Sequence, residues 1–147
     1  MEQVVELLGG ELAIGRVRTS IDIPPGIHVL GDRVQLQLVV RNLLRNAVDA
    51  MQDTPADQRV VTIHSRADDN VVVALSDTGH GLPEGRSVEE LFAPYYSTKE
   101  DGIGIGLPIC RLILEAHGGR IWAEPNATGG LTVSFKLPLE PGGHHRD

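Results

Sequence analysis

The chain is poor in cysteine, in aromatic residues and in positive charge. Its single cysteine, Cys110, permits no internal disulfide and is typical of a reducing compartment. Aromatic residues make up 3% of the 147 residues, so we expect an aliphatic core without the stacking platforms that bind single-stranded nucleic acid. The formal net charge of −7 argues against a nucleic-acid partner and against an anionic-membrane surface.

The sequence also contains no long apolar segment. No run approaches the roughly 18 residues of a membrane span, and the acidic N-terminal segment, interrupted by Gly9-Gly10, does not have the composition of a signal peptide. The hydrophobic content of 41% and the length fit one soluble globular domain. We therefore expect a monomeric cytoplasmic domain over residues 1–139, not inserted in a membrane, followed by a flexible tail over residues 140–147.

Residues 34–51 are predicted to form one amphipathic helix. Its apolar residues recur at steps of three and four: Leu36, Val39, Val40, Leu43, Leu44, Ala47, Val48 and Met51. Asp32 is a suitable N-cap. Asn42 and Asn46 lie one turn apart and Asp49 follows three residues later, so the three share a side. Asn is a poor helix former, and both a wet surface stripe and a functional site would explain this polar line.

The remaining pattern mixes strands with helices. We expect helices over residues 4–14, 88–92 and 107–117, and strands over residues 16–23, 28–30, 60–66, 71–75, 120–124 and 131–137. Strands in hairpins with helices between them predict an α+β fold, with one mixed or antiparallel sheet and helices on one face. Residues 84–106 lack periodicity outside the short helix, and so long a connection is usually functional or mobile.

Two glycine motifs carry possible chemistry. In Asp77-Thr78-Gly79-His80-Gly81, at the end of a strand, the carboxylate can accept from an exocyclic amine in a pocket that glycines keep open, although an ordinary turn uses the same residues. Gly102-Ile103-Gly104-Ile105-Gly106-Leu107 opens a helix, whose unpaired N–H groups and positive dipole end can bind phosphate. Its surroundings fit neither a dinucleotide fingerprint nor a P-loop.

In combination and order, these motifs resemble the catalytic ATP-binding domain of sensor histidine kinases. That superfamily includes gyrase B, heat-shock chaperone ATPases and mismatch-repair ATPases. The matching segments are the N box at 42–47, the first glycine box at 77–82, the F box at 91–99, the second glycine box at 102–107 and the last box at 129–132. Residues 96–99 and 115–119 are similar to the oxygen- and nitrogen-sensing kinases in particular.

The resemblance implies a fold, two cofactors and a set of site residues. The fold would be a two-layer α/β sandwich of the Bergerat type, with a mostly antiparallel sheet on three helices and a mobile ATP lid. ATP and Mg²⁺ would bind, with Asn46 as the metal ligand, Asn42 beside the phosphates and Asp77 on the adenine amine. The other implied ATP contacts are Gly79 and Gly81 at the purine, Gly102, Gly104, Gly106 and Leu107 at the phosphates, Lys99 as a phosphate cation or a solvated side chain, and Thr132 through water or as plain strand surface.

The resemblance also implies a reaction. Chaperone and topoisomerase relatives carry a water-activating Glu where this chain has Asn42, and Asn cannot act as a general base, which favours a kinase over an ATPase. The acceptor would be a histidine of a separate dimerisation domain, with residues 1–15 as the connection and a response regulator downstream. Asp49 stands where many members have Lys, and Leu38 where a polar residue is common. The alternatives are a serine kinase of the anti-sigma-factor type and a non-catalytic nucleotide-binding regulatory module.

Overall fold

The computed structural model describes residues 18–22, 31–67, 69–82, 87–92 and 106–138. Within these ranges one five-stranded sheet has the order β1-β2-β3-β5-β4. Its strands are β1 (Arg18–Asp22), β2 (Val60–Ala67), β3 (Asn70–Ser76), β4 (Arg120–Pro125) and β5 (Leu131–Pro138). Only β1 and β2 are parallel among the four pairings, so the predicted mixed, mostly antiparallel sheet is confirmed.

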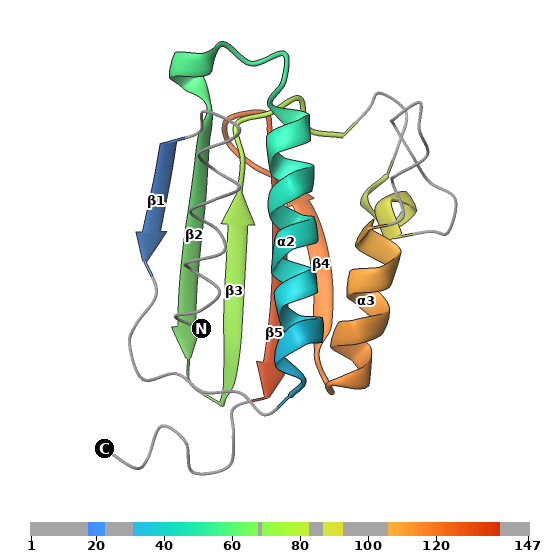
Figure 1. Cartoon of the computed structure of the whole chain (residues 1–147). Helices are drawn as coiled ribbons and strands as arrows, with labels where there is room; N and C mark the ends of the chain where they lie inside the picture. The colour runs from blue at the N-terminus through green and yellow to red at the C-terminus, as the bar shows by residue number, and fades with distance from the viewer. Residues whose placement is uncertain (1–17, 23–30, 68, 83–86, 93–105, 139–147) are drawn as a thin grey trace.

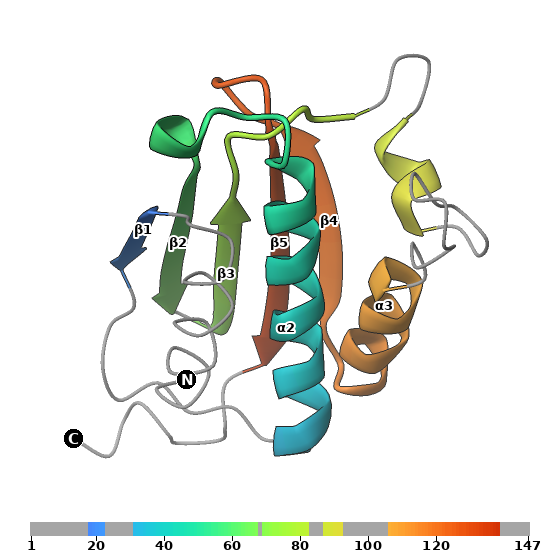
Figure 2. The same cartoon turned by 45° about the horizontal axis from the view of Figure 1, so that its top comes forward.

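The described helices cover one face of this sheet. In both views α2 (Arg33–Ala50) lies in front of the strands, and α3 (Gly106–Ala116) lies beside it, next to β4 (Figures 1 and 2). Two short 3₁₀ helices, η1 (Ala56–Gln58) and η2 (Val88–Phe92), complete the described helical segments. The predicted two-layer α+β architecture is therefore confirmed, whereas the expected helix at 4–14, the expected strand at 28–30, most of the expected lid and the tail lie outside the described residues.

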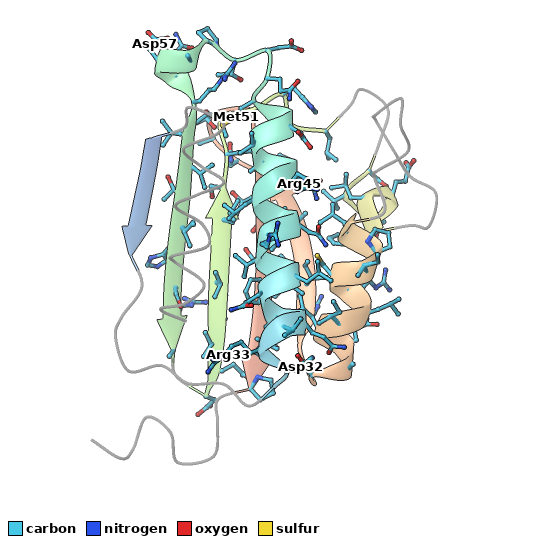
Figure 3. The ribbon with its side chains drawn as sticks, in the orientation of Figure 1. Asp32, Arg33, Arg45, Met51 and Asp57 are labelled. Atoms are coloured by element: carbon cyan, nitrogen blue, oxygen red, sulfur yellow. The ribbon has the colours of Figure 1, made fainter. Side chains whose placement is uncertain are left out.

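Helix α2 forms where the sequence predicts it. The Asp32 side chain caps its start by accepting from the Gln35 backbone N–H at 3.1 Å. The helix ends with Met51 as C-cap, and Figure 3 shows Asp32 and Met51 at its two ends with Arg45 between them. Its predicted apolar face is buried against the sheet, whereas Arg45 is exposed.

The core is almost entirely aliphatic, as the composition predicts. β2 and β3 alternate buried and more exposed residues, and their buried side chains share one core with α2 and α3. Phe92 and Phe135 are the aromatic side chains that take part in this core among the described residues. The helices are therefore fixed to the sheet by branched side chains that fit closely.

Helix α3 ends in a glycine cap that also holds the start of α2. Gly118 adopts a φ of 76°, and the Gly119 N–H donates to the Leu114 carbonyl at 2.8 Å, as in a Schellman motif. The ring of His117 donates from Nδ1 to the Ile113 carbonyl at 2.8 Å and accepts the Asp32 N–H at Nε2 over 3.0 Å. These two partners require the neutral Nδ1–H tautomer. His117 thus joins the end of one helix to the start of the other.

Candidate functional site

The candidate site lies where the end of β3 meets the start of β5. Ser76 pairs with Thr132 across the sheet, and the next residue, Asp77, donates its N–H to the Leu131 carbonyl at 3.1 Å. The turn over residues 126–130 closes this edge, and the C-terminal end of α2 lies at the same end of the sheet (Figure 1). Residues from three segments far apart in the sequence therefore meet here.

Asp77 presents one fixed and one available carboxylate oxygen. The residue is 5% exposed, and its Oδ1 accepts from the N–H groups of Gly79 at 2.8 Å and Leu131 at 3.2 Å. Among the described residues, no hydrogen bond is made to Oδ2. Burial raises the pKa of the Asp77 carboxyl above its ordinary value, although both N–H groups and His80 favour the charged form. The arrangement can receive a hydrogen-bond donor at Oδ2 in a fixed direction.

The two glycines of the loop allow it to pack directly against its neighbours. A Cβ at Gly79 would overlap the carbonyl of Ala50, the last residue of α2, and that carbonyl accepts the His80 N–H at 3.1 Å. Gly81 has a φ of 71°, and a Cβ there would overlap the Gly129 carbonyl oxygen. Both positions therefore require glycine for close contact, and Gly81 also for its backbone conformation.

Thr78 holds the same loop from the other side, a role that the sequence does not indicate. Its hydroxyl donates to the Gln58 carbonyl at 2.8 Å and accepts the Val60 N–H at 3.1 Å. Its own carbonyl accepts from the Thr54 hydroxyl at 3.3 Å. A threonine after a strand-end aspartate suggests only a turn, because its partners lie about twenty residues away in the sequence.

Asn42 and Asn46 project from α2 and are both half-buried, as expected for residues that share a side. The Asn42 side chain hydrogen-bonds the thiol of Cys110 on α3, which is fully buried. That thiol also lies 3.7 Å from the Val39 carbonyl, and burial raises its pKa to about 12. Asn46 lies one turn before Ala50, so it is close along the helix to the contact with the Asp77 loop.

The other predicted residues are placed as follows. Thr132 lies beside Ser76 with 2.7 Å between their hydroxyl oxygens. Gly106 begins α3, and Leu107 is buried in the core. Lys99, Gly102 and Gly104 lie outside the described residues. The structure therefore groups Asp77, Gly79, Gly81 and Thr132 in one network, with the two asparagines on the helix that contacts it.

The part of the chain that the structure describes lacks two further features. It includes no group of three or more His, Cys, Asp or Glu side chains that could hold a metal ion. No helix in the described part of the chain has the length and apolarity needed to cross a membrane.

Comparison with known proteins gives consistent matches. Residues 31–141 match the family described as histidine kinase-, DNA gyrase B-, and HSP90-like ATPase. The chain is 48% identical over 123 residues to the sensor protein FixL of Bradyrhizobium diazoefficiens, covering 84% of this chain and 24% of FixL. It is 35% identical over 142 residues to sporulation kinase C of Bacillus subtilis, covering 95% of this chain and 32% of that kinase. The chain thus spans a third or less of these relatives.

A solved structure extends the similarity to three dimensions. The catalytic domain of the histidine kinase ThkA superposes with a TM-score of 0.78 at 30% identity, covering 97% of this chain and 91% of that domain. The sensor histidine kinase MprB, at 21% identity and a TM-score of 0.77, has the same fold.

Proposed function

Because the chain belongs to the histidine kinase-, DNA gyrase B-, and HSP90-like ATPase family, we propose that it is the phosphate-donating part of a two-component sensor histidine kinase. In this proposal it binds Mg-ATP and transfers the γ-phosphate to a histidine on a separate dimerisation domain, from which a response regulator receives it. The single observation that carries the proposal is the buried Asp77 carboxylate, with one oxygen fixed by two N–H groups.

Asp77 supports an adenine site because of the direction in which it accepts. With Oδ1 held by Gly79 and Leu131, Oδ2 is the oxygen that would receive the exocyclic amine of adenine. A hydrogen bond between a charged acceptor and a neutral donor contributes about 1.5–3 kcal/mol. Gly79 and Gly81 would let the loop lie close to the purine, and Thr132 would reach it through water.

The donor set on α2 fits Mg²⁺. This ion prefers oxygen ligands and is usually held by one or two protein groups together with phosphates. Asn46 would supply its amide oxygen to the ion, and Asn42 would lie beside the phosphates. When bound, the ion would neutralise the charge of the phosphates.

The start of α3 is suited to the phosphates. The first N–H groups of a helix have no partner within the helix, and the positive end of its dipole attracts anions. Gly106 and Leu107 occupy this position, since α3 begins at Gly106. Lys99, Gly102 and Gly104 are proposed contacts on the basis of their motif alone.

Transfer is favoured over hydrolysis because the site offers no base to water at Asn42. An amide is not a general base. Among the described residues, the Cys110 thiol interacts with Asn42; burial raises its pKa to about 12, so it stays protonated at neutral pH. ATP should therefore persist until an acceptor side chain is positioned in line with the γ-phosphate.

The acceptor domain would dock on the outer faces of the two helices. Four large apolar side chains are exposed there among the described residues: Val34 and Leu38 on α2, and Ile109 and Leu112 on α3. Val34 and Leu112, at 74% and 68% exposed, are the most accessible of the four to a partner. We also place the domain in the cytoplasm, where ATP is available and a lone thiol stays reduced.

A labelling experiment tests the reaction. The chain alone, incubated with γ-labelled ATP and Mg²⁺, should bind nucleotide but hydrolyse it slowly and carry no label. Adding the acceptor-histidine domain should produce acid-labile label on that domain, weakly because the two parts are not tethered. An acceptor with its histidine replaced by alanine is the control. Acid-stable label would indicate a serine kinase, and binding without any label would indicate a regulatory module.

A further inference from the structure

The side chain of Asn126 organises the turn between β4 and β5. Its Oδ1 accepts three hydrogen bonds, from the Thr128 N–H at 3.0 Å, the Thr128 hydroxyl at 2.7 Å and the Gly130 N–H at 3.0 Å. The Asn126 N–H and the Gly130 carbonyl close the same turn at 3.1 Å. Because Thr128 and Gly129 are exposed, this turn is held by hydrogen bonds and not by apolar packing.

The amide nitrogen of the same side chain points out of the turn and reaches Asp77, the residue that follows β3. Nδ2 donates to the Asp77 carbonyl at 3.0 Å and lies 3.5 Å from the Thr132 hydroxyl oxygen. The partners fix which atom is oxygen and which is nitrogen, since three donors face one end and a carbonyl faces the other. Asn126 therefore uses its acceptor within the turn and its donor on Asp77, which lies 49 residues away in the sequence.

The turn and the Asp77 carboxylate are in direct contact. The Leu131 N–H that fixes Oδ1 belongs to the residue that immediately follows the turn. A Cβ at Gly130 would overlap the Asp77 carbonyl and lie 2.6 Å from Oδ1. A displacement of the turn would thus move the Leu131 donor away from the carboxylate and free the carboxylate to rotate.

We propose that Asn126 is the positioning residue for purine selectivity: its amide holds the Asp77 backbone and the Thr132 hydroxyl in register with the turn that orients the Asp77 carboxylate. This rests on the proposed ATP site. Thr132 is included because its hydroxyl also forms a hydrogen bond with Ser76, so a displaced Asn126 changes both residues that face the purine.

Selectivity is the property that distinguishes positioning from simple stabilisation. A fixed carboxylate accepts a hydrogen bond from the adenine amine and so favours ATP binding. Guanine has a carbonyl at that position, so two acceptors would face each other and GTP would bind more weakly. A carboxylate that can rotate away still binds ATP weakly but no longer excludes GTP, because the unpaired acceptor finds water. Partial unfolding would weaken the binding of ATP and GTP equally and leave the ratio of their affinities unchanged. Loss of Asn126 should instead lower the ratio of ATP to GTP affinity.

Asn126→Asp separates the two ends of the side chain. It keeps the oxygen that closes the turn but replaces the Nδ2 donor with an acceptor facing the Asp77 carbonyl. Ala127→Asp is the matched control, because it adds the same charge to an exposed position of the same turn and leaves Asn126 intact. Affinities would be measured by competition of ATP and GTP against a fluorescent ATP analogue with Mg²⁺, with circular dichroism to establish that each variant is folded.

We expect the ratio of ATP to GTP affinity to fall about tenfold in Asn126→Asp and to stay unchanged in Ala127→Asp. An unchanged ratio in folded Asn126→Asp would overturn the positioning role, whereas a parent chain that binds neither nucleotide would overturn the ATP site itself. If the Asp variant does not fold, the same affinity ratio is measured in Asn126→Ser, whose hydroxyl can close a turn but is too short to reach Asp77. The ratio should fall in this variant too, and an unchanged ratio would overturn the positioning role. In the parent, the Asn126 amide protons should exchange slowly and shift on addition of ATP; fast exchange without a shift would equally refute the proposal.

Discussion

Replacing Asp77 with asparagine changes the hydrogen-bonding direction of the site without changing its shape. The amide oxygen of Asn can accept from the N–H groups of Gly79 and Leu131, as Oδ1 does in the parent. The amide nitrogen then occupies the position of Oδ2, so a donor replaces the acceptor. The adenine amine would then face another donor and form no hydrogen bond, whereas the carbonyl of guanine would accept a hydrogen bond from the new amide.

The magnitude follows from the hydrogen bond that is lost. A hydrogen bond to a charged group contributes about 1.5–3 kcal/mol, which corresponds to roughly tenfold to more than a hundredfold in affinity. We expect ATP affinity to fall in this range and GTP affinity to stay level or rise, so that the preference is reversed or abolished. The fold should persist, because burial disfavours the charged carboxylate in the parent and the amide carries no charge.

The raised pKa of Asp77 adds a dependence on pH. Between the ordinary pKa and the raised one the folded chain holds more protons at this group than the unfolded chain. The contribution of Asp77 to the free energy of unfolding therefore decreases as pH rises through that window. ATP affinity has the opposite trend: below the raised pKa, Oδ2 is protonated and becomes a donor, so affinity is lost as pH falls. Asp77→Asn should lack both dependences.

Competition binding of ATP and GTP, repeated across the pH range in which the parent stays folded, provides the assay. Asp69→Asn is the matched control, since it removes the same charge from an exposed residue at the opposite end of β3. Undiminished ATP affinity in folded Asp77→Asn, or the same loss in Asp69→Asn, would refute the assignment of Asp77 to adenine.

Three further perturbations follow from the described contacts. Asn46→Ala should remove most of the Mg²⁺-dependent part of ATP affinity with the fold intact; titrations with and without Mg²⁺ that match the parent would exclude the metal role. Gly81→Ala should destabilise more than Gly129→Ala, because both have positive φ but only Gly81 also faces an overlapping carbonyl; urea unfolding should give about 1–2 kcal/mol for Gly129, and equal losses would contradict the packing. His117→Ala should cost about 0.5–1.5 kcal/mol by removing the hydrogen bond between the ring and the exposed Asp32 N–H, and an unchanged urea midpoint would show that water replaces the ring.

Much of this fold is predictable because its signals are local. The apolar period of α2, its Asp32 cap and the glycine cap after α3 each depend on residues within two turns of one another. The family resemblance was equally accessible, since its boxes are short and ordered, and family membership confirms it. The sheet class followed from hairpin spacing, although the parallel pairing of β1 with β2 has no local signal.

The connections that define the site were not predictable in the same way. Asn126 resembles any turn asparagine until the register of β3 with β5 places it against Asp77. His117 has the spacing of a core residue, and its bond to Asp32 spans 85 residues. Cys110 gave only an inference about redox compartment, although its thiol contacts Asn42. Each of these contacts depends on how separate elements pack, and single-sequence periodicity carries no such information.

The position of Asp77 between two hairpins has a consequence for folding kinetics. The β2–β3 and β4–β5 hairpins join strands close in sequence, whereas β3 pairs with β5 through residues such as Ser76 and Thr132, which are 56 residues apart. Closing so long a loop has a high entropic cost, and proteins rich in such contacts fold slowly. The carboxylate and the donors that orient it therefore come together only when the two hairpins join. A nucleotide bound across that junction would stabilise the β3–β5 pairing, whose residues are the furthest apart in the sequence. It would therefore act mainly by slowing unfolding.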